Sequence, residues 1–322
     1  MPTRRRQPFD DREIDPLINS GVRAFKRLDR QAQLGVIIVL LIAGVVAAII
    51  YYRGQHQQAA GPGPTSAGAV ESPNLIVGNP SGATADMGSP DNFLMVKPYF
   101  VLSYNNSNGT ANWVSWRVAV SDLGTAPRKP VFDADTLLPP GFRVIVHKDY
   151  SGSGFDRGHL CPHGDRSANE DMSFSTFVMT NIIPQAPNVN EKAWAQMESY
   201  CRQLVRQGQR LYVIAGPSGH GGRGSRGFAK SIGGGKVTVP AECWKIVVVV
   251  PDTGVDDPGQ ISIGSRVIAV IMPNDSSVSR TTDWRTFKVG ASAIEARTGL
   301  RLMSDVAEPV RTHLESQVDS AP

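Results

Sequence analysis

The stretch Asp156-Arg157-Gly158-His159-Leu160-Cys161-Pro162 places a carboxylate, a guanidinium, a glycine and an imidazole on four successive residues. This combination can bring metal-water contact, phosphate contact and close backbone approach into one small region. The imidazole has an unperturbed pKa of about 6.5, so near neutral pH it is largely neutral and can accept a proton. Taken alone, the tetrapeptide also fits a plain Asp-Arg ion pair that precedes a buried histidine.

A second segment of interest is 180–185 (TNIIPQ), which follows an apolar run at 174–179 that we expect to be a buried strand. Beyond it, apolar side chains at steps of three and four predict an amphipathic helix with Trp194, Met197, Cys201 and Leu204 on one face. Gly208 lies just past its end. Asn190, at its start, suits an N-cap, and for an isolated asparagine we would favour that role.

Together the two segments resemble the signature of the DNA/RNA non-specific endonucleases, a ββα-metal family that includes secreted bacterial sugar-non-specific nucleases and mitochondrial endonuclease G. The resemblance covers residues 93–305. It implies an α+β fold, with a central antiparallel sheet flanked by helices and the ββα-metal element on one face. It also implies a Mg²⁺-dependent hydrolase, with Mn²⁺ as a substitute, that cleaves DNA and/or RNA and leaves 5′-phosphate ends.

The resemblance assigns the central catalytic roles. It makes His159 the general base that activates water and Asn190 the one protein ligand to Mg²⁺. Glu198, eight residues after Asn190, and Asp156 would orient metal-bound waters. At about 100° per helical residue, Asn190 and Glu198 are roughly 80° apart around the axis, so both can border one site.

Further roles follow from the same resemblance. Asn181 would buttress the pocket, and Arg157 would pair with an acid or with phosphate. Arg128, within 126–130 (APRKP), lies where the family carries an arginine that reaches the scissile phosphate. Lys129 and Arg117 are alternatives for that role, because loop sequence alone does not distinguish them.

A zinc site is a rival interpretation of the same region. His159, Cys161 and His163 alternate as one face of a strand would, and Cys161 or Cys201 could help build such a site. Pro162 interrupts a regular strand, however, and the chain has no Cys-x-x-Cys spacing. Its three cysteines leave disulfide pairing among Cys161, Cys201 and Cys243 open.

The N-terminal 33 residues are basic, with eight Lys/Arg against five Asp/Glu, and they carry most of the chain's formal net charge of +4. The high isoelectric point is therefore not a sign that the rest binds nucleic acid. Leu17, Gly21, Phe25 and Leu28 can share one face of a short helix on an anionic membrane surface. A solvated basic tail fits equally well.

Residues 34–52 (LGVIIVLLIAGVVAAIIYY) carry no charge, and as a helix they would span about 28 Å of a bilayer core of about 30 Å. We expect a single transmembrane signal anchor with residues 1–33 in the cytoplasm and the catalytic domain outside. A cleaved signal peptide fits less well because the apolar run is long and no small-x-small site comes after it. A mitochondrial presequence fits poorly because the tail contains five acids.

The remaining boundaries follow from composition. Residues 53–92, rich in Gly, Ala, Pro and Ser, predict a flexible linker. The endonuclease domain should begin at Phe93, with strands at 100–104 and 113–120 and with Trp113 and Trp116 in the core. Further strands are expected at 211–217, 244–250 and 267–272, and residues 306–322 should form a polar tail.

The expected partners are DNA and RNA substrates and a membrane, reached through one N-terminal helix. The basic segment 219–230 would be either a phosphate-gripping rim or a solvated loop. The sequence leaves the oligomeric state open, a homodimer included. A second class of function is a membrane-tethered nucleic-acid-binding or uptake protein without turnover, which need not keep the complete set of His159, Asn190 and Glu198.

Overall fold

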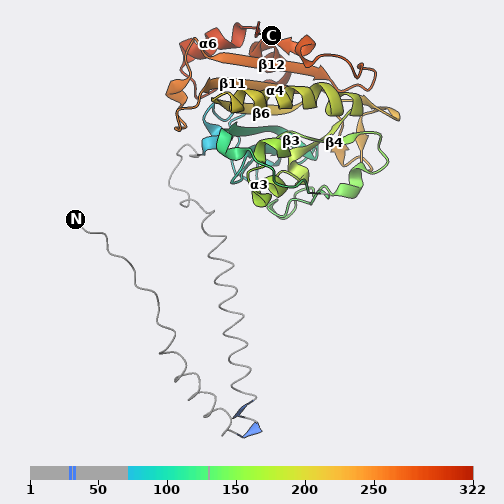
Figure 1. The fold of residues 1–322 in the computed structure, drawn as a ribbon. Coiled ribbons are helices and arrows are strands. Elements are labelled where there is room, and N and C mark those ends of the chain that lie inside the picture. Colours follow the sequence, from blue (N-terminus) through green and yellow to red (C-terminus); the bar gives the residue numbers. More distant parts are fainter. Residues whose placement is uncertain (1–28, 31, 34–71, 130, 322) are drawn as a thin grey trace, which may run out of the picture. The chain divides into compact units, whose positions relative to one another are not determined.

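The computed structural model describes residues 29–30, 32–33, 72–129 and 131–321 (Figure 1). The chain divides into two units, Met1–Gly68 and Ala69–Pro322, and the second carries the predicted endonuclease domain. The predicted membrane anchor at 34–52 and most of the predicted linker lie outside the described residues. No helix within the described ranges is both long and apolar enough to cross a membrane.

A seven-stranded antiparallel sheet forms the centre of the second unit (Figure 1). Its strands, in spatial order, are β1 (Phe93–Val96), β2 (Val101–Asn105), β3 (Thr110–Val118), β6 (Gln209–Ser218), β11 (Glu242–Pro251), β12 (Arg266–Pro273) and β13 (Lys288–Val289). The two strands expected at 100–104 and 113–120, the core tryptophans and the later strands are therefore present. The run of valines in β11 suits a strand that is covered on both faces.

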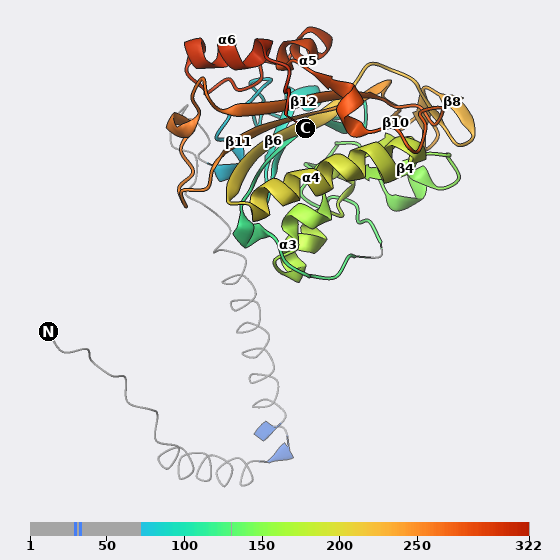
Figure 2. The ribbon, with the colours of Figure 1, turned by 45° about the horizontal axis from the view of Figure 1, so that its top comes forward.

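Helices cover both faces of this sheet (Figure 2). One face packs against α4 (Ala195–Arg206), and α3 (Glu170–Ser175) lies on the same side. The other face packs against α5 (Ala291–Thr298) and α6 (Glu308–Ser316). This arrangement is the predicted α+β architecture of a central antiparallel sheet flanked by helices.

Short ladders and turns supply the rest of the fold. The three two-stranded ladders pair β4 (Asp156–His159) with β5 (Ile182–Gln185), β7 (Gly222–Gly224) with β8 (Gly227–Ala229), and β9 (Ser231–Ile232) with β10 (Val237–Thr238). Val189–Trp194 forms a π-helical turn that leads into α4. The 3₁₀ turns are Pro73–Leu75, Pro90–Asn92, Val120–Asp122, His147–Tyr150, His163–Arg166, Met179–Asn181, Pro258–Gln260 and Trp284–Phe287.

The expected strand at 174–179 is wrong. Its first residues belong to α3, and residues 179–181 form a 3₁₀ turn. The reason is local: the side chain of Asn169 accepts a hydrogen bond from the backbone nitrogen of Met172 at 2.9 Å and so caps a helix there. Capping chemistry outweighs the apolar character of the run.

The predicted linker ends earlier than residue 92. Leu75 and Val77 are buried in the layer beneath the sheet, and the Trp113 indole nitrogen donates to Ser81 Oγ at 2.8 Å. Ser115 Oγ donates to the Asn74 carbonyl at 2.6 Å. A few apolar anchors among many small residues were enough to order this segment, which overall composition could not reveal.

The predicted polar tail at 306–322 is also part of the fold. Its helix α6 buries Leu314 against the same layer, and Val306 is buried just before it. The Asp319 carboxylate accepts from Arg266 Nε at 2.7 Å and lies 2.8 Å from Lys288 Nζ. The segment looked polar because its buried apolar residues are few and its acids are engaged in ion pairs.

We predict that a chain beginning at Phe93 is less stable than one beginning at Ser72. Losing the buried side chains of Leu75 and Val77 should lower the free energy of unfolding by about 3–6 kcal/mol, at about 1.5–3 kcal/mol for each side chain. Urea unfolding of the two chains measures this difference. Equal unfolding midpoints would show that residues 72–92 contribute nothing to the free energy of unfolding.

Candidate active site

The β4–β5 ladder carries the Asp156–His159 motif. Its register pairs Asp156 with Gln185 and His159 with Ile182. A Cβ on Gly158 would lie only 2.2 Å from Gln185 Oε1 and 2.6 Å from Gln185 Cβ. The motif therefore requires glycine at this position, because the Gln185 side chain crosses directly over the backbone.

Asn181 holds the chain just after His159. Its Oδ1 accepts from the Cys161 backbone nitrogen at 2.9 Å, and its Nδ2 donates to the Cys161 carbonyl at 2.8 Å and to the Thr176 carbonyl at 2.9 Å. The side chain is completely buried. The structure thus places Asn181 where it buttresses the backbone that carries His159.

His159 lies in an aromatic pocket. Its ring centroid is 4.8 Å from that of Phe177, edge to face, and 5.2 Å from that of Phe132. The residue is 8% exposed, and its Nε2 has no hydrogen-bond partner among the described residues. Burial, helped by the charges of Arg128 and His163, lowers the pKa of His159 to about 3. The imidazole is therefore neutral, with one nitrogen free to take a proton.

Arg128 reaches the same pocket. Its guanidinium carbon lies 5.1 Å from the centroid of the Phe177 ring, so Arg128 and His159 contact one aromatic side chain. No carboxylate among the described residues pairs with Arg128. The two alternatives are occupied elsewhere: Lys129 pairs with Asp133, and Arg117 pairs with Asp122 at 3.2 Å and with Asp256 at 3.6 Å. Geometry favours Arg128 as the arginine of the site.

Asn190 belongs to the π-helical turn and does not cap the helix. Its Nδ2 donates to Asp156 Oδ2 at 2.9 Å. Because a carboxylate only accepts, the amide nitrogen must face Asp156, and the amide oxygen remains available to a cation. The turn thus brings residue 190 to the first residue of β4, across 34 positions of sequence.

The neighbours of Asn190 are suited to a hydrated cation. Burial raises the pKa of Asp156, although the hydrogen bond from Asn190 opposes the rise. Both amide atoms of Gln185 are buried without a partner among the described residues, and Gln185 pairs with Asp156 across the ladder. Amide and carboxylate oxygens are ligands for Mg²⁺ and its waters, so these residues fit the ion that the family resemblance implies.

Glu198 lies on α4, largely buried. Burial raises the pKa of its carboxyl, and Lys245 is the leading influence that lowers it. The Lys245 ammonium stands 3.7 Å from Glu198 Oε1. We expected Glu198 to orient metal-bound waters. The structure adds Lys245 as a buried counter-charge, which the sequence did not predict.

Arg157 makes its contacts with protein groups. It donates to the His147 carbonyl at 2.7 Å and to Ser151 Oγ at 3.2 Å, and it stacks over the Tyr150 ring. The acid partner that we expected for Arg157 is not among its contacts in the described part of the chain. These contacts anchor the 147–151 turn to β4, and a phosphate contact remains a proposal.

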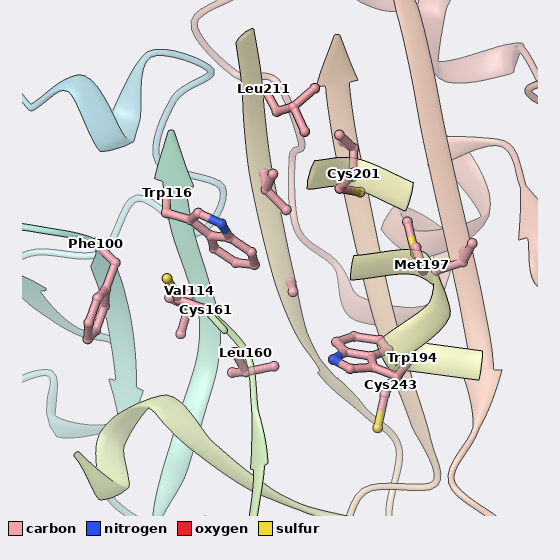
Figure 3. Packing of buried hydrophobic residues seen from close by; sticks show 14 of the residues in the cluster. Phe100, Val114, Trp116, Leu160, Cys161, Trp194, Met197, Cys201, Leu211 and Cys243 are labelled. Atoms are coloured by element: carbon pink, nitrogen blue, oxygen red, sulfur yellow. The ribbon is translucent and has the colours of Figure 1, made fainter. Parts of the chain in front are cut away.

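The zinc interpretation finds no geometric support. Across residues 72–129 and 131–321, no group of three or more His, Cys, Asp or Glu side chains is placed to hold a metal. Cys161, Cys201 and Cys243 are free and buried, and Figure 3 shows them dispersed among apolar side chains. Burial raises the pKa of each thiol, which disfavours the thiolate that zinc requires.

Several residues of the site escaped sequence reasoning. Phe132 and Phe177 form the aromatic pocket, and no motif in the sequence marked either residue. Gln185 ends the segment 180–185, but no sequence pattern indicated a separate role for it. Only Lys245 could have been recognised from the sequence, because it is a single cation within the otherwise apolar run 243–250.

The α+β fold, the buried histidine and the amide-carboxylate pair suit a metal-dependent phosphodiesterase of the nuclease class. A family model described as DNA/RNA non-specific endonuclease matches residues 79–308, and the chain belongs to that family. It is therefore a nuclease that hydrolyses nucleic acids, and the alternative of a binding protein without turnover is set aside.

Individual relatives agree with this assignment. A nuclease of Nostoc sp. is 43% identical over 287 residues, which cover 89% of this chain and 100% of that protein. Nuclease C1 of Cunninghamella echinulata var. echinulata is 31% identical, over 67% of this chain and 84% of its own. Among solved structures, a chain of the EndoG/EndoGI complex matches with a TM-score of 0.60 at 23% identity, covering 74% of this chain and 95% of that chain, which speaks for the fold alone.

We predict that folding stability depends on pH through His159. In the unfolded chain the imidazole binds a proton below a pH of about 6.5, whereas in the folded protein the pKa is near 3. Stability contributed by this group is present above the unfolded pKa and is lost as the pH falls. Between pH 6 and pH 4, the wild type should lose up to about 1.4 kcal/mol per pH unit more than His159→Gln.

Urea unfolding at successive pH values, with chelator present, measures the two slopes. His147 and His163 also have pKa values lowered by burial, but they are common to both proteins and cancel in the comparison. Parallel slopes for wild type and His159→Gln would mean that the imidazole charges freely in the folded state.

Proposed function

We propose that this nuclease is a Mg²⁺-dependent endonuclease that hydrolyses both DNA and RNA, with Mn²⁺ as a substitute, and leaves 5′-phosphate ends. The single observation that carries the proposal is the Nε2 of His159, which is buried, neutral and unpartnered among the described residues, on the same four-residue strand as Asp156. A buried polar atom without a partner is unfavourable unless substrate or solvent supplies one during function.

His159 acts as the general base in this proposal. Burial keeps the ring unprotonated at neutral pH, so Nε2 is free to accept a proton from water, which then attacks phosphorus. Phe132 and Phe177 keep bulk solvent from the ring, which strengthens the electrostatic interactions around it. Arg128, unpaired with any carboxylate in the described residues, is placed to balance charge that develops on the phosphate.

Asn190 would hold the cation through its amide oxygen, with Asp156, Glu198 and Gln185 turned toward the ion's waters. When bound, Mg²⁺ would supply charge stabilisation for the phosphate and the departing 3′ oxygen. In the protein itself, Asp156 orients the Asn190 amide through their 2.9 Å hydrogen bond. This orientation selects oxygen over nitrogen as the atom presented to the cation.

Substrate recognition would rely on the phosphate backbone, which gives little sequence preference and strong inhibition by salt. The β7–β8 hairpin supports this proposal. Its Ser225 backbone nitrogen donates to the Gly154 carbonyl at 2.8 Å, so the hairpin lies against the residues that precede Asp156. An open groove of about 500 Å³ runs between Arg223 on this hairpin and Asn188 near the π-helical turn.

We predict that His159→Ala abolishes cleavage of plasmid DNA and of RNA in the presence of Mg²⁺. Loss of a general base lowers rates by about 10² to 10⁴, whereas binding to the phosphate backbone should be nearly unchanged. Gel assays with and without chelator, together with binding measured by fluorescence anisotropy, separate the two effects.

His313→Ala is the matched control, since His313 is an exposed histidine on α6 and should keep wild-type turnover. A His159→Ala protein that keeps more than about a tenth of wild-type turnover would contradict the assignment of the base. Wild-type cleavage that persists in the presence of chelator would contradict the proposed dependence on Mg²⁺.

We further propose that residues 34–52 anchor the nuclease in a membrane, with residues 1–33 cytoplasmic and the catalytic domain outside. The support is the uncharged 19-residue run and the basic segment that precedes it. A nuclease without sequence preference that faced the cytoplasm would threaten the cell's own nucleic acid, which also favours the external orientation. A homodimer is compatible with this arrangement.

Protease added to intact cells, or to spheroplasts where there is an outer membrane, should release a soluble, active fragment. Because the fold begins with the 3₁₀ turn at Pro73–Leu75, we expect the cut within residues 54–71. The fragment's N-terminus can be read by mass spectrometry. A fragment that appears only after lysis would show that the catalytic domain faces the cytoplasm.

A further inference from the structure

A lysine lies inside the core and forms an ion pair with Glu198, one of the proposed site residues. On strand β11, Cys243, Lys245 and Val247 point to the same face, and Cys243 and Val247 belong to the apolar cluster that packs under α4. The Lys245 side chain is 2% exposed. A charged group at this position needs a physical reason, because the neighbouring positions of the strand are filled by apolar side chains.

The surroundings of the Lys245 ammonium are aromatic. Its Nζ lies 4.2 Å from the centroid of the Trp194 ring and 5.4 Å from that of Trp116. Figure 3 shows Trp116 from the sheet and Trp194 from the helical side projecting into this layer. Cation–π contacts of this kind offset only part of the unfavourable transfer of the ammonium from water.

Glu198 is the acid that partners Lys245 in the described part of the chain, with 3.7 Å between Lys245 Nζ and Glu198 Oε1. Arg202, on the same helix as Glu198, is a less suitable counter-charge because it lies 3.1 Å from Asp165 Oδ1. Arg128 also acts on Glu198, but it extends from an exposed loop. Lys245 therefore provides the buried positive charge dedicated to Glu198.

Stability alone does not account for this pair. A buried ion pair is often no better for folding than well-packed apolar side chains of similar volume, and a methionine would fit among Trp116, Trp194 and Val247. Either charge left alone in this layer would be strongly unfavourable. The pair makes sense if the proposed function requires a carboxylate at this position, and Glu198 keeps 14% of its side chain exposed.

We propose that Lys245 is a positioning residue of the nuclease reaction, which holds the Glu198 carboxylate charged and directed into the site from beneath. The proposal rests on the proposed function, in which Glu198 orients waters of the bound cation. Lys245 touches neither substrate nor cation in this scheme and acts only through Glu198.

The test compares Lys245→Met, Glu198→Gln and the double variant, with Lys288→Met as the matched control. Lys288 is also an ion-paired strand lysine, 2.8 Å from Asp319, but it lies on edge strand β13. With plasmid DNA and Mg²⁺, each single variant should lower kcat about 10- to 100-fold, as loss of a supporting partner does, with KM within about threefold of wild type.

The double variant should be no slower than Glu198→Gln alone, because Lys245 has nothing to act through once the carboxylate is gone. Lys288→Met should keep the wild-type kcat. The proposal is overturned if Lys245→Met keeps more than about half of the wild-type kcat, or if the two losses multiply in the double variant.

Thermal melting in chelator gives a readout that does not depend on activity. Each single variant leaves one charge buried and unpaired, so the double variant should melt at a higher temperature than either single variant, even where a single variant barely folds. Additive losses of Tm would refute the coupling. Absence of Mg²⁺-dependent cleavage by the wild type would instead refute the proposed function. The melting comparison would still test the coupling between Lys245 and Glu198.

Discussion

As the proposed general base, the imidazole of His159 must be shielded from bulk water and yet keep one nitrogen without a protein partner. Burial between Phe132 and Phe177 meets the first requirement, and it also makes the neutral form of the ring the stable one. The second requirement can be met only if the backbone is held so that no protein group reaches Nε2. The two hydrogen bonds between the Asn181 amide and the Cys161 backbone provide that restraint directly after the histidine.

A short ladder cannot hold such geometry alone, because an isolated pair of strands is at best marginally stable. The β4–β5 ladder is attached to the large sheet through Asn274, which comes directly after β12 and is fully buried. Its Nδ2 donates to the Pro184 carbonyl at 3.0 Å, and its Oδ1 accepts from the Ala186 nitrogen at 2.7 Å. The end of β5 and the start of the π-helical turn are thereby fixed to one strand, which also sets the position of Asn190 relative to Asp156.

Much of this architecture was predictable from local patterns. The apolar runs of β6, β11 and β12 and the periodicity of α4 carry their structure in their own residues, and the motif around His159 is contiguous. The parts that sequence reasoning missed depend on distant contacts. Residues 72–92 are ordered by Trp113 and Ser115, and the role of Phe177 exists only because Arg128 and His159 converge on it. A π-helical turn precedes α4 where a cap by Asn190 was expected, and the Asn190 side chain bonds to the distant Asp156.

The titratable groups of the site oppose one another as the pH changes. Burial lowers the pKa of His159, so this group favours the folded state less as the pH falls. Burial raises the pKa values of Asp156 and Glu198, so at neutral pH their charged forms oppose folding, and that opposition is relieved as the pH falls through their pKa values. A cation beside the two carboxylates would favour their charged forms without requiring the histidine to change its protonation state. Burial therefore keeps the imidazole neutral and leaves the two acids dependent on positive charge, which Lys245 supplies to Glu198 and which the proposed cation would supply to Asp156.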